Sequence, residues 1–457
     1  MHALLISTYE LGRQPFGLAS PAAWLRAAGW DVSCVDVAKE RLHRAAIERA
    51  DLVGFHLPMH TATRLAGPVI ANVKEINASA RLCAYGLYAP LNAGWLRSLG
   101  IDAVFGGEFE AALRDYALSA APSDVGAAGT SVPRIHFLVP DRSGLPPLAQ
   151  YATLDVGGGR RKIVGSTEAS RGCRHLCRHC PVVPIYHGQF RVVPPEVVLA
   201  DIDAQVAAGA EHVTFGDPDF FNGPTHAMRV VDALHAAHPH VTFDVTIKVE
   251  HLLHQRHLLG RLSSAGCAFV TSAVESIDDA VLRTLDKGHT RQDFVEAVAV
   301  CRDANLTFVP TFVAFHPWLT LDGYCDLLDL IDQLDLVDHV APIQLAMRLL
   351  IPDGSRLLDL DDVRERVGPF DAATLAYPWV HADARVDDLQ RDIARLVGVR
   401  AGVDRRAMFD EIAALAYART GRSPRATVRR PERPLVPQLS EPWYCCAEPN
   451  PDHLTLV

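Results

Sequence analysis

The sequence has no run of 18 apolar residues, and no basic segment precedes an apolar core in Met1 to Leu4. The first absence argues against a membrane-spanning helix, and the second argues against a signal peptide. Basic residues are also in deficit, because 44 Lys and Arg stand against 54 Asp and Glu, for a net charge of -10. Phosphate backbones are bound mainly through Lys and Arg, so nucleic acid is not an expected partner. We expect a cytoplasmic protein with no membrane partner.

Regular cysteine spacing is missing as well, although the chain has ten cysteines. This argues against a disulfide scaffold and fits a reducing compartment. The 457 residues give room for two or three domains, and 49% hydrophobic with 21% charged residues is ordinary for a globular enzyme. Five cysteines lie in apolar or helical patterns and are expected in the core, namely Cys34, Cys83, Cys267, Cys301 and Cys325.

Three other cysteines form a motif with the spacing C-x-x-x-C-x-x-C, at Cys173, Cys177 and Cys180. Three thiolates on one short loop can ligate three irons of a 4Fe-4S cluster and leave the fourth iron open to a small molecule. A structural zinc site is the alternative, but no second C-x-x-C is present to pair with the first. Its fourth ligand would come from one of three nearby histidines, His175, His179 or His187.

With Thr167 to Gly172 leading in and Pro181 following, the motif resembles that of the radical S-adenosylmethionine (radical SAM) superfamily. The resemblance implies that the open iron binds the amino and carboxylate groups of S-adenosylmethionine (SAM). It also implies that an electron from the cluster breaks a carbon–sulfur bond of the sulfonium. An electron donor such as flavodoxin or ferredoxin would then be a partner. One position departs from the family, because the residue before the third cysteine is usually aromatic and here is His179.

Residues 1–120 alternate short apolar runs with segments of crossover-helix length, which predicts a parallel, doubly wound sheet. The candidate strands are 3–7, 32–37, 52–56, 82–85 and 103–105. This order resembles the Rossmann-like, cobalamin-binding type of domain that precedes many radical SAM barrels, and Gly106 to Glu110 matches the G-E-x-E turn near its end. The D-x-H-x-x-G signature, which supplies a histidine to cobalt, is absent. We therefore expect no bound cobalamin, although some relatives without the signature do bind it.

Residues 121–160 are rich in Pro, Gly, Ser and Ala and are expected to form a linker. Residues 161–355 repeat strand and helix patterns, which predicts an open, partial (β/α)6 barrel of the TIM type with its active site at the carboxyl ends of the strands. The candidate strands are 163–170, 212–215, 241–248, 268–274, 307–315 and 339–345, with helices expected at 195–208 and 291–305. Residues 356–457 form a helical and irregular C-terminal extension.

Candidate cofactor-binding residues follow the second and fourth of these strands. Gly216 and Asp217 align with the glycine-and-acid motif that in the family binds the amino group of SAM. Glu275 and Ser276 resemble the segment that contacts the ribose and carboxylate of the cofactor. The resemblance therefore assigns these four residues to SAM.

The third, fifth and sixth strands add further candidates. On the third strand, alternation puts Lys248 and Glu250 on one face. If that face lines the barrel, Lys248 lies beside the cofactor, and otherwise the two residues form an internal ion pair. We also assign Arg348, after the sixth strand, to the cofactor. Three further residues either touch the substrate or pack behind the site, namely His316, Trp318 and Gln344.

The chain from Arg419 is basic and rich in proline, and it ends with the adjacent thiols Cys445 and Cys446. Trp443 to Pro449 resembles the tail of the radical SAM subfamily with a CUAEP or CCAEP ending, in which selenocysteine can replace the second cysteine. A neighbouring tail family is associated with forming arsenic–carbon bonds, and paired thiolates suit soft acceptors such as trivalent arsenic. We expect Cys445 and Cys446 to act in catalysis by holding such an acceptor, with arsenite as the small-molecule substrate, while a SAM-derived carbon fragment is transferred.

Two other functions stay open at this point. One is a cobalamin-dependent radical SAM methyltransferase, in which the first domain carries the methyl donor. The other is a non-catalytic zinc or metalloid-binding protein, in which the tail is a sensor.

Overall fold

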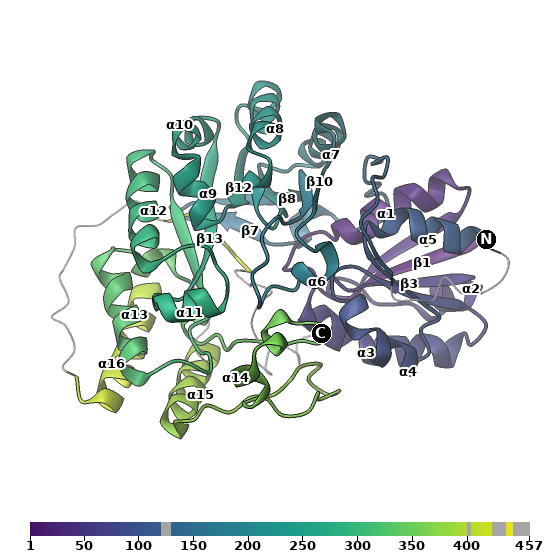
Figure 1. The fold of residues 1–457 in the computed structure, drawn as a ribbon. Coiled ribbons are helices and arrows are strands. Elements are labelled where there is room, and N and C mark those ends of the chain that lie inside the picture. Colours follow the sequence, from purple (N-terminus) through teal and green to yellow (C-terminus); the bar gives the residue numbers. More distant parts are fainter. Residues whose placement is uncertain (120–128, 400–403, 423–435, 442–457) are drawn as a thin grey trace.

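The computed structural model describes residues 1–119, 129–399, 404–422 and 436–441. Two α/β units follow one another along the chain (Figure 1). The N-terminal unit, in purple and blue, lies at one side, and the larger unit, in teal and green, lies at the other. Helices of the C-terminal extension complete the second unit.

The N-terminal unit is built on a parallel sheet with the strand order β2-β1-β3-β4-β5-β6. The strands are β1 (His2–Ser7), β2 (Asp31–Asp36), β3 (Leu52–His56), β4 (Arg81–Tyr85), β5 (Ala103–Gly107) and β6 (Gly129–Ser131). The helices are α1 (Phe16–Ala27), α2 (Arg44–Arg49), α3 (His60–Ile76), α4 (Ala93–Ser98) and α5 (Phe109–Leu118). The predicted doubly wound sheet is confirmed, and its crossover helices lie where the sequence placed them.

Both faces of this sheet are apolar. Successive strand residues point to opposite sides, and here both sets are hydrophobic. Leu4 and Ile6 pack with residues of α2, α3 and α4, whereas Ala3 and Leu5 pack with residues of α1 and α5. Helices therefore cover both faces, as a parallel sheet requires. The carboxyl ends of β1, β3, β4 and β5 are left at one edge.

The second sheet has the order β14-β13-β12-β11-β8-β7-β15. Its parallel strands are β8 (Arg161–Thr167), β11 (His212–Phe215), β12 (Thr242–Thr246), β13 (Cys267–Glu275) and β14 (Phe308–Phe312), and β7 (Thr153–Asp155) and β15 (Gln438–Leu439) extend it in antiparallel fashion. The surrounding helices are α7 (Pro195–Ala207), α8 (Pro224–Ala237), α9 (Val249–His254), α10 (Arg256–Ser264), α11 (Asp279–Thr284), α12 (Arg291–Asp303) and α13 (Leu321–Gln333). The C-terminal extension adds α14 (Asp361–Arg364), α15 (Ala384–Val399) and α16 (Arg405–Thr420).

The prediction of a sixth barrel strand at 339–345 is wrong. Most of this segment forms two short 3-10 turns, Val337–His339 and Pro342–Leu345, and the pairing with the fifth strand is reduced to a single bridge between Phe315 and Arg348. Pro342 has no amide proton to donate to a ladder, which disfavours a strand here. The barrel is therefore a half-barrel of five parallel strands.

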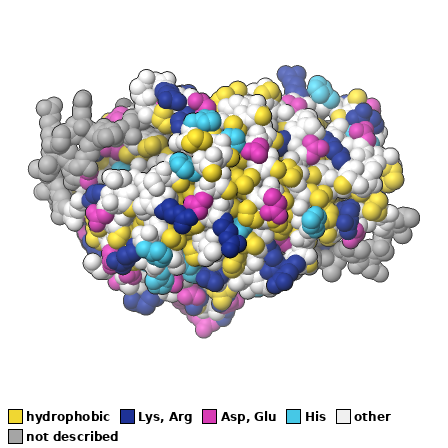
Figure 2. Space-filling model, turned by 90° about the horizontal axis from the view of Figure 1, so that it is seen from above, with side chains coloured by type: hydrophobic (Ala, Val, Ile, Leu, Met, Phe, Trp, Pro, Cys, Tyr) yellow, Lys and Arg dark blue, Asp and Glu magenta, His cyan; other side chains and the backbone are white. Residues whose placement is uncertain are grey.

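The expected linker is partly built into the fold. Gly129–Ser131 pairs with β5, and Thr153–Asp155 pairs with β8, so this segment extends both sheets. The five cysteines expected in the core are all buried. In the face shown in Figure 2, acidic, basic and hydrophobic side chains are interspersed. No helix among the described residues is long and apolar enough to span a membrane.

Candidate active site

The cluster motif forms a loop between β9 (Ser170–Gly172) and α6 (Val183–Tyr186). Cys177 is buried, Cys173 and Cys180 are half-buried, and none of the three is in a disulfide. Burial raises the pKa of the Cys173 thiol to about 11, so an isolated thiol would keep its proton. A bound iron would displace that proton. Three cysteine thiols on one loop are a donor set that fits a 4Fe-4S cluster.

Lys248 lies beside this loop, just after β12 and at the start of α9, rather than within the third strand as the sequence predicted. Its Nζ is 3.9 Å from the Cys177 Sγ and 3.7 Å from a carboxylate oxygen of Glu250. Lys248 is buried, with 7% of the residue exposed. A buried cation at this position favours negative charge on the cluster thiolates.

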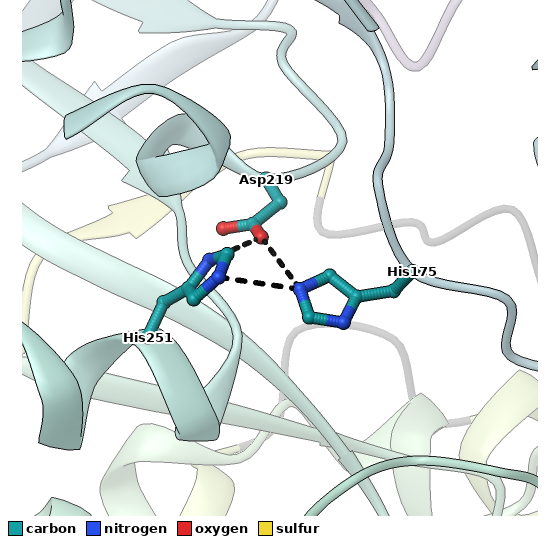
Figure 3. A group of neighbouring side chains, drawn as sticks. All are labelled: His175, Asp219 and His251. Carbon is teal, nitrogen blue, oxygen red and sulfur yellow. Dashed lines mark hydrogen bonds and ion pairs between the residues drawn. The ribbon is translucent and has the colours of Figure 1, made fainter. Parts of the chain in front are cut away.

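A second group of side chains meets the loop at the ends of β11 and β12. His175, Asp219 and His251 point toward one another (Figure 3). Asp219 Oδ2 lies 2.6 Å from His251 Nδ1 and 3.7 Å from His175 Nε2. This oxygen is buried, and its partners among the described residues are these two imidazole rings. Sequence reasoning missed Asp219, and the available signal was the second acid in Gly216-Asp217-Pro218-Asp219.

Asp217 occupies a different environment. One carboxylate oxygen accepts a hydrogen bond of 2.5 Å from the Ser170 hydroxyl, and the other accepts one of 2.9 Å from the Ala169 amide. Burial raises the pKa of this carboxyl to about 7. Both oxygens are therefore engaged with the strand that leads into the cluster loop. A Cβ added at Gly216 would lie 3.5 Å from the Glu168 side chain and 3.9 Å from the guanidinium of Arg13, which belongs to the N-terminal domain.

Glu275 ends β13 in a left-handed backbone conformation, with φ of +66°. Its carboxylate lies 3.1 Å from His179 Nε2 and 3.4 Å from Lys287 Nζ. Burial alone would raise its pKa, but Lys287 and His179 together lower it to about 2. The histidine that departs from the family pattern is thus tied to the acid that we assigned to SAM. The Ser276 hydroxyl accepts a hydrogen bond from the Asp278 amide at 3.1 Å.

Glu275 and Ser276 also line a cavity of about 230 Å³, together with His316 and Trp318. Gln344 is fixed elsewhere, because its side-chain oxygen accepts a hydrogen bond from the Phe312 amide. Arg348 pairs with Asp387 of α15 at 2.7 Å and stacks on the Trp379 ring. The structure therefore places Arg348 in contact with the C-terminal extension, and its assignment to the cofactor stays a prediction.

The N-terminal sheet presents polar groups at the carboxyl ends of its strands. Ser7 Oγ, Glu10 Oε2, His56 Nδ1 and Tyr85 Oη are buried without hydrogen bonds to other described residues. Glu10 Oε2 and His56 Nδ1 nevertheless lie 3.3 Å apart, and the His56 ring stacks on Tyr85. Buried polar groups without partners are uncommon in folded proteins and call for a ligand or water. These polar groups make the strand ends a candidate site for a polar ligand.

An apolar cluster joins this sheet edge to the cluster loop. It contains Met59 and Tyr88 of the N-terminal domain, Val182 of the loop, and partly buried Cys173 and Cys180. The ends of the N-terminal strands and two of the cluster cysteines are thus packed in one region. A ligand on the sheet edge would face the metal site.

The tail thiols Cys445 and Cys446 lie outside the described residues. The last described residue before them, Glu441, contacts the N-terminal domain, with one oxygen 3.3 Å from the Tyr9 hydroxyl and the other 3.8 Å from Lys39 Nζ. Just before it, Gln438–Leu439 pairs with β7. The chain leading to the tail therefore runs between the two domains.

Comparison with known protein families gives two matches. Residues 167–331 match the radical SAM superfamily, and residues 3–117 match the B12 binding domain. Curated relatives include a tRNA-2-methylthio-N(6)-dimethylallyladenosine synthase of Desulfosudis oleivorans, 25% identical over 38% of this chain and 38% of that protein. Another is the bacteriochlorophyllide d C-8(2)-methyltransferase of Chlorobaculum tepidum, 25% identical over 42% of this chain and 44% of that protein. The chain thus spans less than half the length of these relatives.

Solved structures extend the comparison to nearly the whole chain. The cobalamin-dependent SAM radical enzyme OxsB, with aqua-cobalamin and SAM bound, superposes with a TM-score of 0.67 at 14% identity, over 92% of this chain and 71% of that one. The radical SAM methyltransferase TsrM of Kitasatospora setae, with cobalamin and a [4Fe-4S] cluster, gives 0.56 at 18% identity, over 73% of this chain and 70% of that one. At these identities the likeness concerns the fold. The chain thus carries a B12-binding domain match at residues 3–117, ahead of a radical SAM domain match at residues 167–331, in a fold like that of OxsB.

Proposed function

We propose that the protein is a cobalamin-dependent radical SAM methyltransferase. The observation that carries this proposal is the packing of the N-terminal sheet edge against the cluster loop, with Met59, Tyr88, Cys173 and Cys180 in one apolar cluster. Such packing would bring a cobalamin on the sheet and SAM on the cluster into one enclosed space. The match to the B12 binding domain and the cobalamin-containing structural neighbours support the same assignment.

The expectation of no bound cobalamin is not supported. It depended on the missing D-x-H-x-x-G signature, which concerns only a histidine ligand to cobalt. The polar side chains of Ser7, Glu10, His56 and Tyr85 offer another way to hold the cofactor, through its peripheral amides. In this proposal cobalamin supplies the methyl group, and these four residues bind and orient it.

For SAM, we propose that Asp219 rather than Asp217 accepts the ammonium group. Asp219 is fully buried and its Oδ2 faces only the ring nitrogens of His251 and His175, whereas both oxygens of Asp217 accept hydrogen bonds from Ala169 and Ser170 of the chain leading into the cluster loop. Lys248, beside Cys177, is placed to attract the SAM carboxylate. Glu275 and Ser276 border the 230 Å³ cavity and stay our candidates for the ribose contact.

The acceptor is proposed to be a small molecule, and its identity stays open. Trivalent arsenic held by Cys445 and Cys446 stays a prediction, because those thiols lie outside the described residues and the comparisons do not support arsenic. An electron donor such as flavodoxin or ferredoxin is proposed from the superfamily assignment alone.

Product analysis under anaerobic conditions tests the proposed function. Reconstituted protein is incubated with SAM and a reductant, with and without cobalamin. If the protein transfers methyl groups through cobalamin, S-adenosylhomocysteine should be released only when cobalamin is present. Reductive cleavage of SAM is followed separately, by the release of 5'-deoxyadenosine. A Cys177→Ala variant should release no 5'-deoxyadenosine, because it lacks one ligand of the cluster. S-adenosylhomocysteine at the same rate without cobalamin would contradict the proposal.

A further inference from the structure

Arg171, two residues before the first cluster cysteine, is surrounded by three carboxylates. Its Nη1 lies 3.1 Å from a Glu108 oxygen and 2.7 Å from a Glu110 oxygen, and its Nε donates to Glu168 at 2.7 Å. Arg171, Glu108 and Glu110 are all buried. Glu108 and Glu110 belong to the G-E-x-E turn after β5, whereas Glu168 and Arg171 belong to the radical SAM domain. One guanidinium therefore joins the two domains at the base of the cluster loop.

Neighbouring side chains hold the two glutamates in place. The Ser20 hydroxyl donates to Glu110 at 2.6 Å, and the Tyr186 hydroxyl donates to Glu108 at 3.3 Å. The rings of Phe16 and Phe137 lie 5.5 and 5.2 Å from the guanidinium carbon of Arg171. The guanidinium is thus fixed by charge, by hydrogen bonds to its partners and by two aromatic rings.

The connection from Arg171 to Cys173 has little freedom. Gly172, between them, has a φ of +77°, and a Cβ added there would lie 2.4 Å from the Tyr186 ring and 2.5 Å from the Gln189 carbonyl oxygen. Arg171 itself pairs with Arg191 in the short antiparallel ladder of β9 and β10. A shift of Arg171 must therefore move Cys173, because the intervening residue is packed on both sides.

Stability alone does not explain the network. Replacing a buried ion pair by apolar residues of similar volume is often neutral or stabilising, so a buried ion pair is weak evidence of a gain in stability. Here three carboxylates surround one guanidinium, which leaves an excess of acid. Burial raises the pKa of Glu108 to about 7, which lets it carry a proton and relieve part of this excess.

We infer that Glu108 and Glu110 are positioning residues, which through Arg171 fix the cluster loop against the B12-binding domain and so set the separation between the two cofactors. The role of the separation rests on the proposed function. Methyl transfer between centres on two domains depends on their distance, and a misplacement of about 1 Å can cost on the order of 100-fold in rate.

The test compares Glu110→Gln and Arg171→Lys with a buried control, Asp244→Asn. Glutamine keeps the shape of Glu110 and loses its charge, and lysine cannot reproduce the planar fork of Arg171. Asp244 is also buried and lies on β12, away from the cluster loop. Its carboxylate accepts a hydrogen bond from the Thr214 hydroxyl and pairs with the His212 ring. The control therefore reports the general effect of losing one buried carboxylate.

Two measurements are made on cobalamin-loaded, cluster-reconstituted protein. Electron paramagnetic resonance measures the magnetic interaction between cob(II)alamin and the reduced cluster, which depends on their distance. Hydrogen exchange measures the opening of the backbone at residues 171–177, whether or not cobalamin is bound. We expect Glu110→Gln and Arg171→Lys to alter the magnetic interaction and to raise exchange at 171–177 by about tenfold or more over the Asp244→Asn control.

The outcomes separate the two proposals. Wild-type protein that holds no cobalamin overturns the proposed function, and exchange at 171–177 still decides the attachment of the loop to the N-terminal domain. Variants with wild-type exchange and an unchanged magnetic interaction overturn the positioning role alone. A variant that loses its cluster but keeps wild-type exchange at 171–177 also overturns it, because the loop would then be fixed without the network.

Discussion

The two acids of Gly216-Asp217-Pro218-Asp219 allow a sharp test, because their carboxylates have different partners. Asp217 accepts hydrogen bonds from the Ala169 amide and the Ser170 hydroxyl. Asp219 Oδ2 instead faces the ring nitrogens of His251 and His175. The perturbation is therefore Asp219→Asn, with Asp217→Asn as the matched control two residues away.

The magnitude follows from the kind of bond that is lost. A hydrogen bond to a charged group contributes about 1.5–3 kcal/mol. Because about 1.4 kcal/mol corresponds to a factor of ten, the Kd for SAM should rise by roughly 10- to 150-fold in Asp219→Asn. Asp217→Asn should leave the Kd nearly unchanged and instead lower the free energy of unfolding by about 1–3 kcal/mol, because its buried partners lose an acceptor.

Anaerobic titration calorimetry with SAM measures the Kd, and iron content is measured first so that only cluster-loaded protein is compared. A weakened Asp217→Asn beside an unaffected Asp219→Asn would refute the reasoning. The carboxylate that accepts the ammonium would then be the one that the sequence motif indicated, and its hydrogen bonds to Ala169 and Ser170 would have to rearrange.

Three further predictions concern other parts of the chain. Cys177→Ala should abolish the cluster, with iron falling from about four per chain toward zero by metal analysis, and full iron occupancy would contradict the cluster assignment. Burial raises the pKa of Glu108 to about 7, so the folded state holds a proton that the unfolded state loses, and stability should fall as pH rises from about 4.5 to about 7. Glu108→Gln should flatten this part of the curve of Tm against pH. An unchanged slope would contradict the raised pKa of Glu108. If the tail presents the acceptor, Cys446→Ser should keep its iron and should still cleave SAM slowly. It should lose product formation and tight arsenite binding, because serine is a poor ligand for a soft centre. A Cys446→Ser variant with normal product yield would show that the tail thiols do not hold the acceptor.

The parts that sequence predicted are those set by local pattern. The strands 52–56 and 212–215 were placed at their observed bounds, because apolar runs between turn residues report burial directly. The three cluster cysteines share one loop by their spacing alone. The sixth barrel strand failed because its apolar pattern also suits buried 3-10 turns around Pro342.

The parts that sequence missed depend on contacts between distant segments. Asp219 and His251 are 32 positions apart, and only the adjacent ends of β11 and β12 bring them to His175. The pairing of Glu110 with Arg171 joins two domains, and nothing near either residue in the sequence indicates it. Glu275 was assigned to SAM from its motif, and its pairing with His179 and Lys287 is visible only in three dimensions.

In the proposed function, one chain holds a 4Fe-4S cluster and cobalamin together. The direct measurement is the content of iron and cobalt in protein reconstituted anaerobically with iron, sulfide and hydroxocobalamin, then freed of unbound cofactor. We expect about four irons and one cobalt per chain, with Cys177→Ala losing the iron and keeping the cobalt. Protein that holds iron but no cobalt, or zinc in place of iron, would contradict it.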